Sequence, residues 1–600
     1  MGLIVFDAET FYDPKQGYSL NTMSTSEYVL DPRFKLLGFG VTTNKGTRYL
    51  HGDILLRAPT FRKALEESVI IAHNAHFDAA ILAWHYGIRP KGWICTLQMA
   101  RAKGVHMHNP RRSVSLENLC LQFGLGQKPP LTPNSTPEEL AIRGGWDANA
   151  TMELFKILNV GFPKEELRLI DMTIRQYTEN VVMGDVAKLQ ELKTKIEAQK
   201  AQALTSLGIT EEDLASSPKF QVILEQLGVE VPMKVSPKGN IIPAFAKGDE
   251  GMQELINHDN PIVATLAETR LQVKSTTDRT RADTFLRLQE LHGSLPVFYN
   301  YWGTHPGRWS GGDGSNFANL KRGGVLRDCI MAPPGHLLIE ADMKQIQARL
   351  AAWLAGQEDL LEAFAAKRDV YCEFGGDLFH RPITKADEFE RFCAKFWVLG
   401  GWFGMGGNAG AAQLKAKIIA EKHPFTPPTP EEAALHVATL RERYHRMQPL
   451  WAQMEWMLAE PGREIGPLVM GENKVILPNG MAINYPGLRY EAYTGFNGKP
   501  KKGWRYQGRE GWVELWGGKQ TQNACLALER TLLAFFMLKL MPYWHIVMHT
   551  YDSLCLCIKE TQLDSARAAL THVMTTPPAW CADLPLGVDI GWGKTYGECG

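Results

Sequence analysis

The sequence predicts a mixed α/β protein of several domains, and three observations support this class. The chain has 600 residues, of which 44% are hydrophobic, and this is enough for several cores. Residues 1–160 alternate short apolar strands with helical stretches, as α/β domains do. Helical periodicity follows from Glu165 onward, and two further apolar strands are expected at 336–342 and 546–558.

Charge, cysteine content and hydropathy bear on the partners and the cellular compartment of the protein. The formal net charge is zero, so the phosphates of a nucleic acid would have to be met by local basic clusters. The ten cysteines form no CxxC pair and indicate reduced thiols in a cytosolic compartment. No signal peptide is expected, because MGLIVFDAET has no basic start and no cleavage site. Charged residues interrupt the apolar segment 526–549, so no membrane span is expected.

Two helices are predicted after residue 164. The apolar face of the first would carry Leu167, Ile170, Ile174, Tyr177 and Val181, with Gly184 as its stop. In the second helix we expect Leu189, Leu192 and Ile196 to point inward, with lysines around them at positions 188, 193, 195 and 200. A solvated helix face is the simplest interpretation of these lysines.

An acid stands in the middle of the apolar run IVMHTYDSLCLCI, residues 546–558. A buried carboxylate costs several kcal/mol unless it is paired or bound to a cation. Asp552 therefore either lies solvated at a strand end or hairpin turn, or binds a metal. The segment HLLIEAD, 336–342, is also an expected apolar strand with an acid, Asp342, at its end. Two such strands could share metal ions.

A second set of acids lies near the N-terminus. In IVFDAET, Asp7 and Glu9 are two residues apart on a predicted strand, so both project from one face. Asp78 follows in HNAHFDAAIL, and GGWDANATMELF places Asp147 at an expected helix start. Carboxylate oxygens are hard ligands that suit Mg²⁺ or Mn²⁺, and two such ions can support phosphodiester hydrolysis.

In order and content, these acids resemble the DEDD family of 3′–5′ proofreading exonucleases. The resemblance implies an RNase H-like fold for residues 1–160, with Asp7, Glu9, Asp78 and Asp147 as metal ligands. The family has a Tyr or His four or five residues before the last Asp, which orients the attacking water. Arg143 and Ile142 stand at those places in this chain.

Five segments of the C-terminal half resemble the polymerase domain of family A, the Klenow-like DNA polymerases, and particularly the compact phage members. The resemblance covers nearly the whole chain and implies no 5′-nuclease domain. The segments are GTHPGRWS at 303–310, SNFANL at 315–320, HLLIEADMKQIQARL at 336–350, ERFCAKFWVLGGWFGMGG at 390–407, and the run at 546–558.

The resemblance implies a right-hand polymerase with palm, fingers and thumb. We expect a thumb-like helical region at 161–300, a first palm part at 301–389, fingers at 390–515 and a second palm part at 516–600. Nucleotidyl transfer needs two metal ions, Mg²⁺ or Mn²⁺, which Asp342 and Asp552 would hold from adjacent strands. Arg391 and Lys395 lie one helical turn apart and would clamp the triphosphate.

The family resemblance also assigns residues around the nucleotide and the DNA. Gln347 stands where the family has its steric-gate Glu, Phe403 where it has a Tyr, and Leu399 where it has an aromatic residue. Gln345 and Tyr371 complete the expected nucleotide site. The family motif His-Asp-Glu is Tyr551, Asp552 and Ser553 here. The expected DNA contacts are Arg308, Gln522, Lys188, Lys193 and Asn74, with the loop 499–509 as a further candidate.

The leading hypothesis is a template-directed DNA polymerase that uses dNTPs, binds primer–template DNA and proofreads. Phage genome replication in the host cytoplasm, with other phage replication proteins and without a membrane, is the expected setting. The alternative is a 3′–5′ exonuclease whose C-terminal half only grips DNA, and a non-enzymatic DNA-binding scaffold is a third interpretation. Because Gln347 stands at the steric-gate position in place of Glu, RNA-templated synthesis or ribonucleotide incorporation stays an open alternative. The altered residues Gln347, Leu399 and Phe403 also suggest acceptance of a 2-aminoadenine nucleotide.

Overall fold

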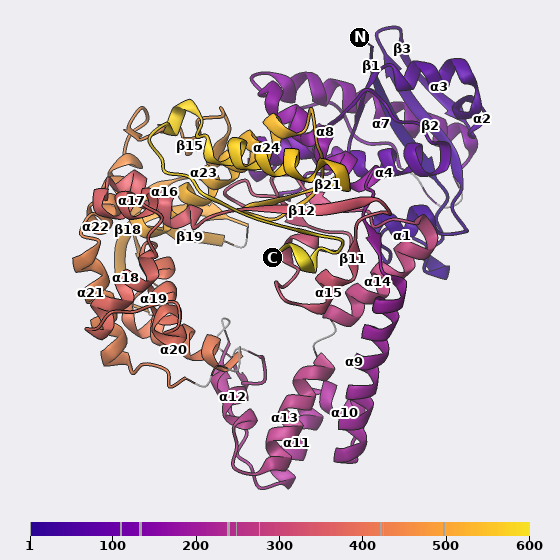
Figure 1. Ribbon diagram of the computed structural model, residues 1–600. Helices are drawn as coiled ribbons and strands as arrows, with labels where there is room; N and C mark the ends of the chain where they lie inside the picture. The colour runs from indigo at the N-terminus through magenta and orange to yellow at the C-terminus, as the bar shows by residue number, and fades with distance from the viewer. Residues whose placement is uncertain are drawn as a thin grey trace. The chain divides into compact units, whose positions relative to one another are not determined.

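The mixed α/β class is confirmed by the computed structural model (Figure 1), whose chain divides into two compact units. The first unit comprises Met1–Gly184, Leu288–Arg368 and Tyr444–Gly600, and the second comprises Asp185–Arg287 and Asp369–Arg443. The structure describes residues 2–108, 111–130, 132, 135–236, 240–247, 249–274, 277–420, 423, 425–495, 498–509 and 511–600.

The N-terminal part of the first unit is built on a five-stranded mixed sheet of order β3-β2-β1-β4-β5. Strand β1 is antiparallel to β2 and parallel to β4, and the register aligns Asp7 with Gly40 and Gly40 with Tyr49. Helix α7 packs across β1, β2 and β3. The elements are β1 Leu3–Thr10, β2 Leu36–Thr43, β3 Gly46–His51, β4 Val69–Ala72, β5 Gly92–Cys95, and α7 Pro137–Asn159.

Helix α7 begins earlier than the sequence predicted, so Asp147 lies in its interior and not at its start. A capping box fixes the beginning of the helix. The Thr136 hydroxyl accepts from the Glu139 backbone N–H, and the Glu139 carboxylate accepts from the Thr136 backbone N–H. The pair Gly144-Gly145 does not break the helix, because Gly144 packs against the sheet. The other helices of this part are α1 Thr25–Leu30, α2 Ile54–Arg57, α3 Pro59–Glu66, α4 Ala75–Ala80, α5 Thr96–Lys103, α6 Leu116–Gln122 and α8 Lys164–Thr178.

Helix α8 is shorter than predicted and does not reach Val181 or Gly184. The Asn180 side chain ends it: its Nδ2 donates to the Gln176 carbonyl at 2.9 Å, and its Oδ1 accepts from Val182 N at 3.0 Å. Gly184 instead belongs to β6, Met183–Gly184, which pairs with β11, Ile330–Met331.

A four-stranded antiparallel sheet of order β20-β21-β12-β22 forms the second sheet of the first unit. The run 546–558 is not one strand, as predicted, but a hairpin that turns at 550–552. The Thr550 hydroxyl closes this turn by accepting from Ser553 N at 3.2 Å. Helices α23 and α24 pack against the sheet. The elements are β12 His336–Met343, β20 His545–His549, β21 Ser553–Lys559, β22 Val588–Gly593, α23 Gly517–Leu540 and α24 Leu563–Thr575.

The segment 499–509, expected to be a loop, belongs mostly to a strand. Within its described residues, β18 Pro500–Gly508 pairs with β17 Arg489–Thr494 and β19 Gly511–Leu515. Aromatic side chains stabilise the pairing, as Tyr490 and Trp504 stack edge to face at 5.4 Å between ring centroids. The remaining elements of the unit are β9 Tyr299–Asn300, β10 Ser310–Gly311, β13 Glu464–Ile465, β14 Leu468–Gly471, β15 Lys474–Ile476, β16 Ala482–Asn484, α15 Val325–Asp328, α16 Ile346–Ala355, α17 Glu358–Ala365 and α22 Met447–Met457.

The second unit is mainly helical. Leu189 and Leu192 of α9 are buried, as their spacing predicted, and Ile196 is half-buried. A core that includes Phe220, Leu224 and Met252 holds several helices together. The elements are α9 Val186–Leu207, α10 Glu211–Ala215, α11 Ser217–Gln226, α12 Glu250–Ile256, α13 Pro261–Lys274, α18 Val370–Phe379, α19 Glu388–Gly401, α20 Gly407–Ala420, α21 Pro430–Arg443, β7 Met233–Val235, β8 Ile241–Pro243 and most of α14, Thr277–His292.

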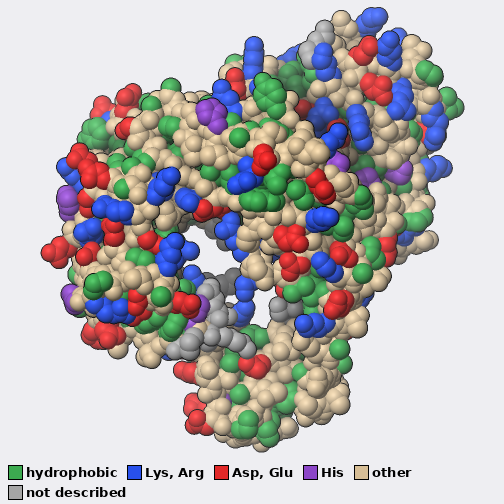
Figure 2. Space-filling model, viewed as in Figure 1, with side chains coloured by type: hydrophobic (Ala, Val, Ile, Leu, Met, Phe, Trp, Pro, Cys, Tyr) green, Lys and Arg blue, Asp and Glu red, His purple; other side chains and the backbone are tan. Residues whose placement is uncertain are grey.

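The surface carries mixed charge, in keeping with the zero net charge. On the face shown in Figure 2, basic and acidic side chains are interspersed. In the part of the chain that the structure describes, no helix is both long and apolar enough to cross a membrane. The ten cysteines are free thiols, nine of them buried.

Candidate active sites

Three of the four N-terminal acids converge at one place. Asp7 and Glu9 project from β1 and Asp147 from α7, and one carboxylate oxygen from each lies within 4.8 Å of the others. Asp147 Oδ1 is buried and has no hydrogen-bond partner among the described residues. Three converging carboxylates with an unsatisfied buried oxygen fit a divalent cation that prefers oxygen ligands.

The fourth acid lies beside this cluster and not within it. Asp78, on α4, is buried and accepts a hydrogen bond from the Ala8 backbone N–H at 2.9 Å, between the two acids of β1. Asn74 adopts a left-handed backbone conformation with φ of 68° directly before α4. Asp78 therefore fixes the strand that carries Asp7 and Glu9.

Burial and mutual repulsion set the protonation of this acid cluster. Burial, followed by the negative charges of neighbouring acids, raises the pKa of Asp7 well above its ordinary value and that of Glu9 to about 7. Burial likewise raises the pKa of Asp78 to about 8. Holding these groups ionised together needs a compensating positive charge, which a bound divalent cation would supply.

Two basic side chains contact Asp147. Lys128 Nζ lies 2.7 Å from Asp147 Oδ2, and Arg143 Nε lies 3.8 Å from the same oxygen. The Arg143 guanidinium also donates to the carbonyl of Pro129 at 3.0 Å, so it holds the loop that carries Lys128. Sequence reasoning identified Arg143 but missed Lys128, which stands in the irregular segment GQKPP with no pattern to mark it.

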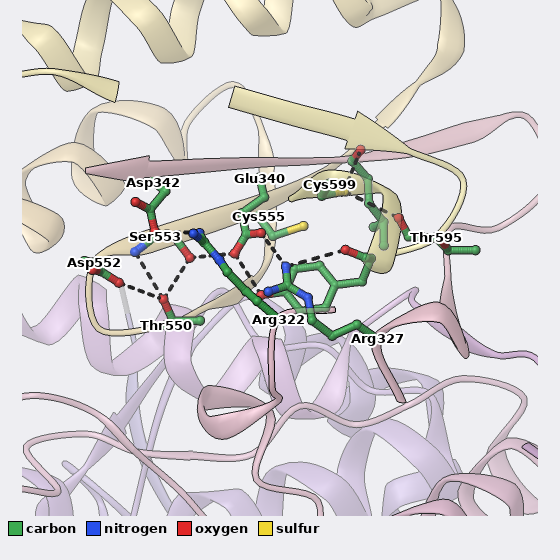
Figure 3. A network of polar contacts seen from close by, with 12 residues as sticks. Arg322, Arg327, Glu340, Asp342, Thr550, Asp552, Ser553, Cys555, Thr595 and Cys599 are labelled. Carbon is green, nitrogen blue, oxygen red and sulfur yellow. Dashed lines mark hydrogen bonds and ion pairs between the residues drawn. The ribbon is translucent and has the colours of Figure 1, made fainter. Parts of the chain in front are cut away.

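The second acid pair lies on the second sheet (Figure 3). Strands β12 and β21 align Asp342 with Ser553, the residue after Asp552. The Met343 backbone N–H donates to the Asp552 carbonyl at 2.8 Å, which ties the two acid-bearing segments together. Arg322 Nη2 donates to Asp342 Oδ2 at 2.8 Å, and the Thr550 hydroxyl donates to Asp552 Oδ1 at 3.3 Å.

These two carboxylates influence each other. Burial, and then the charge of Asp552, raises the pKa of Asp342 to about 7. Burial also raises the pKa of Asp552, although Arg308 and the Thr550 hydrogen bond act in the opposite direction. Two adjacent, partly desolvated carboxylates offer oxygen ligands that fit divalent cations such as Mg²⁺ or Mn²⁺.

A third acid next to this pair, Glu340, is already neutralised and was missed from the sequence. Glu340 is buried and forms an ion pair with the buried Arg327. Its Oε1 accepts from the Ser553 hydroxyl at 2.8 Å (Figure 3). The same oxygen accepts from the Tyr596 hydroxyl at 2.9 Å. Ser553, at the position where the resemblance leads us to expect a Glu, therefore forms a structural hydrogen bond to Glu340. The charge of Glu340 is already compensated by Arg327, so Glu340 is not a good metal ligand.

Arg308 lies close to the second acid pair. Its guanidinium pairs with the fully buried Glu529 of α23 and stacks over the Tyr551 ring at 5.0 Å. Gln347 of α16 donates from Nε2 to Glu529 Oε1 at 3.4 Å. Gln345 has a left-handed backbone conformation with φ of 47°, and its Oε1 accepts from Arg349 Nη2 at 3.4 Å. Gln522 is exposed on α23.

The other expected nucleotide and DNA residues belong to the second unit. Arg391, Lys395 and Leu399 follow one another at four-residue spacing along α19 on its less buried side. Arg391 Nε donates to Asp369 Oδ2 at 2.9 Å and stacks over the buried Tyr371 ring. Phe403 stands in the turn after α19, and Lys188 and Lys193 lie on α9. Lys193 Nζ pairs with Asp283 at 2.8 Å.

Comparison with known proteins connects this fold to one family. The model described as DNA polymerase family A matches residues 186–458. The thermostable DNA polymerase I of Thermus aquaticus is 25% identical over 421 residues, which cover 61% of this chain and 48% of that protein. The DNA polymerase of Bacillus phage SP02 is 25% identical over 281 residues, 44% of this chain and 42% of that protein.

A solved structure extends the likeness to most of the chain. The POL domain of Pol1 from M. smegmatis, in complex with DNA primer-template and dNTP, superposes with a TM-score of 0.68 over 94% of each chain at 16% identity. The family model and the curated relatives thus give the likeness to family A DNA polymerases that the motifs predicted, and the solved structure gives the same fold. The chain spans less than half the length of the first curated relatives that it matches.

Proposed function

We propose that this protein is a template-directed DNA polymerase that extends a primer 3′-hydroxyl with dNTPs. The observation that carries the proposal is the adjacency of Asp342, near the end of β12, and Asp552, in the turn directly before the paired strand β21. The match to family A supports it, as does the likeness to a POL domain solved in complex with DNA primer-template and dNTP.

Asp342 and Asp552 would hold two divalent cations, Mg²⁺ or Mn²⁺. Ions bound there would lower the pKa of the primer hydroxyl and neutralise the leaving pyrophosphate. The chain's own residues hold these carboxylates in place: the Met343–Asp552 backbone hydrogen bond fixes their separation, and the turn at 550–552 keeps Asp552 next to β12. Arg322, paired with Asp342, would give up that contact when cations bind.

We assign the incoming triphosphate to Arg391 and Lys395, with Gln345, Gln347, Tyr371, Leu399 and Phe403 around the nucleotide. Primer–template DNA would contact Arg308, Gln522, Asn74, Lys188 and Lys193. Lys193 would exchange its Asp283 partner for a phosphate, so DNA binding should weaken steeply with salt. The right-hand division into thumb, palm and fingers belongs to the same proposal.

We assign 3′–5′ proofreading to the N-terminal acid cluster in an RNase H-like domain. Asp7, Glu9 and Asp147 would hold the divalent cations that activate water, and Asp78 would complete the set. Phage genome replication in a host cytoplasm is the setting we favour, on the strength of the likeness to the phage SP02 polymerase.

Primer extension and primer degradation with Mg²⁺ test both assignments. Asp552→Asn should abolish extension and leave degradation, whereas Asp7→Asn plus Glu9→Gln should do the reverse. Asp564→Asn, an exposed acid on α24, is the matched control and should change neither. Extension that survives Asp552→Asn contradicts the polymerase assignment. A wild-type protein that degrades primers but never extends them would instead support an exonuclease with a DNA-gripping C-terminal half.

The residues proposed around the nucleotide also bear on base choice. With Gln347, Leu399 and Phe403 at positions where the family has other residues, we propose that the enzyme accepts 2-aminoadenine nucleotide opposite T. Extension across a template T, with dATP and the 2-amino analogue in competition, tests this with proofreading intact and disabled. Exclusive use of dATP in both arms contradicts it.

A further inference from the structure

One buried hydroxyl beside the N-terminal acids has no assigned role. The Tyr49 hydroxyl is buried and has no hydrogen-bond partner among the described residues. A buried, unsatisfied O–H is costly, so natural structures rarely keep one without a function or an absent partner. The two carboxylate charges that act on this hydroxyl are those of Glu9 and Asp7.

The strand register explains how Tyr49 reaches these acids. Tyr49 pairs with Gly40, and Gly40 with Asp7, so the three residues lie in one row across β3, β2 and β1. The next row toward the end of β1 pairs Glu9 with Gly38. A Cβ at Gly38 would overlap the Tyr49 hydroxyl, which therefore lies over Gly38, one strand away from Glu9.

Glycines clear the space for this side chain. A Cβ at Gly144 of α7 would overlap the Tyr49 ring and lie 3.3 Å from Glu9 Cγ. The ring is thus held between α7 and the sheet, on the face that carries the acids. The Arg143 guanidinium contacts the Pro129 carbonyl and Asp147.

We propose that Tyr49 is a positioning residue of the exonuclease site, whose phenol O–H donates a hydrogen bond to the Glu9 carboxylate when that carboxylate binds a divalent cation. A donor that bonds to a metal ligand, and not to the ion itself, fixes the orientation of that ligand and raises its affinity for the ion. The inference rests on the proposed exonuclease function and assigns a role in it to an element, the edge strand β3, that carries none of the acids.

The test measures metal binding as well as activity. In a protein carrying Asp342→Asn plus Asp552→Asn, Mn²⁺ binding followed by electron paramagnetic resonance reports on the N-terminal acids. Tyr49→Phe keeps the ring and removes the hydroxyl, and should weaken Mn²⁺ binding and slow primer degradation by about tenfold each. Tyr86→Phe, which removes a hydroxyl bonded to Asp53 in the same domain, is the matched control and should change neither.

The outcomes separate this inference from the exonuclease proposal. Unchanged Mn²⁺ affinity in Tyr49→Phe overturns the positioning role, even if degradation slows. If the wild-type protein degrades no primer but binds Mn²⁺ through Asp7, the exonuclease proposal fails, while weaker binding in Tyr49→Phe still supports the positioning role. If Asp7→Asn leaves Mn²⁺ binding unchanged in the same background, the inference fails together with the metal site.

Discussion

Gln347 donates a hydrogen bond of 3.4 Å to the buried carboxylate of Glu529, which also pairs with Arg308. Position 347 is the one at which the resemblance leads us to expect a Glu. In this chain the buried carboxylate comes from α23 instead, and the neutral amide of Gln347 avoids placing a second negative charge against it. The residue at 347 and the residue at 529 are therefore coupled.

Gln347→Glu should destabilise the protein by about 1 to 3 kcal/mol, because it sets a carboxylate against Glu529 in a desolvated place. The measurement is the urea midpoint of unfolding. Gln345→Glu is the matched control, since that side chain lies beside Arg349 and tolerates a negative charge. A Gln347→Glu protein as stable as its parent would show that the two positions are not coupled.

Glu166 and Arg530 form a buried ion pair, and removing one partner should strongly destabilise the first unit. Two hydrogen bonds of 2.7 and 2.6 Å join them, and Glu166 Oε1 also accepts from Asn479 at 2.7 Å. Arg530→Met should cost about 3 to 5 kcal/mol of unfolding free energy, because it leaves a buried charge unpaired. Glu166→Gln plus Arg530→Met should recover part of that loss in urea unfolding. Lack of any recovery would contradict a charge-based cause.

The same pair predicts an acid sensitivity. Burial alone raises the pKa of Glu166, but the Arg530 charge and the hydrogen bonds outweigh it and lower the pKa below its ordinary value. The folded state therefore binds fewer protons, so this stabilisation is complete above pH of about 4.3 and is lost as pH falls further. Urea midpoints between pH 6 and 3 should fall more steeply in wild type than in Glu166→Gln. Parallel curves would contradict the prediction.

Local patterns in the sequence predicted the parts of the sites that lie within one element. The two-residue spacing of Asp7 and Glu9 places both on one face of β1, and the apolar run before Asp342 forms β12. The apolar residues on both sides of Asp552 favour one continuous strand, so the hairpin that turns at 550–552 is only one of the interpretations that the sequence leaves open.

Long-range contacts were not predictable in the same way. Lys128 contacts Asp147 from an irregular loop, and the Tyr49 hydroxyl lies over Gly38, the residue that pairs with Glu9, although Tyr49 belongs to the edge strand β3. Neither residue belongs to a periodic pattern or a motif with the acids. Glycines at 38 and 144 hint at close packing, yet a glycine in a sequence does not say which side chain fills the space it leaves.

Metal removal should make stability depend on pH in the direction opposite to that of Glu166. The raised pKa values of Asp7 and Asp78, the latter about 8, mean that the folded protein keeps protons that the unfolded chain releases. Stability in chelator should therefore fall as pH rises from about 4, the ordinary pKa of Asp, to about 8, and Mg²⁺ should reduce the fall. Thermal unfolding of wild type and Asp78→Asn checks this, since the variant should show a flatter dependence. A flat wild-type curve in chelator would contradict it.

Lys128 should oppose metal binding and favour binding of an anionic substrate. Its ammonium lies 2.7 Å from Asp147 Oδ2, so it competes with a cation for that carboxylate and adds positive charge where a phosphate would approach. Lys128→Met should tighten Mn²⁺ binding at the N-terminal acids by about three- to tenfold, while raising the KM for primer degradation. Lys156→Met, which removes an exposed partner of Glu153 from α7, is the control and should shift neither value. If Lys128→Met weakens Mn²⁺ binding instead, the lysine organises Asp147 for the metal and does not compete with it.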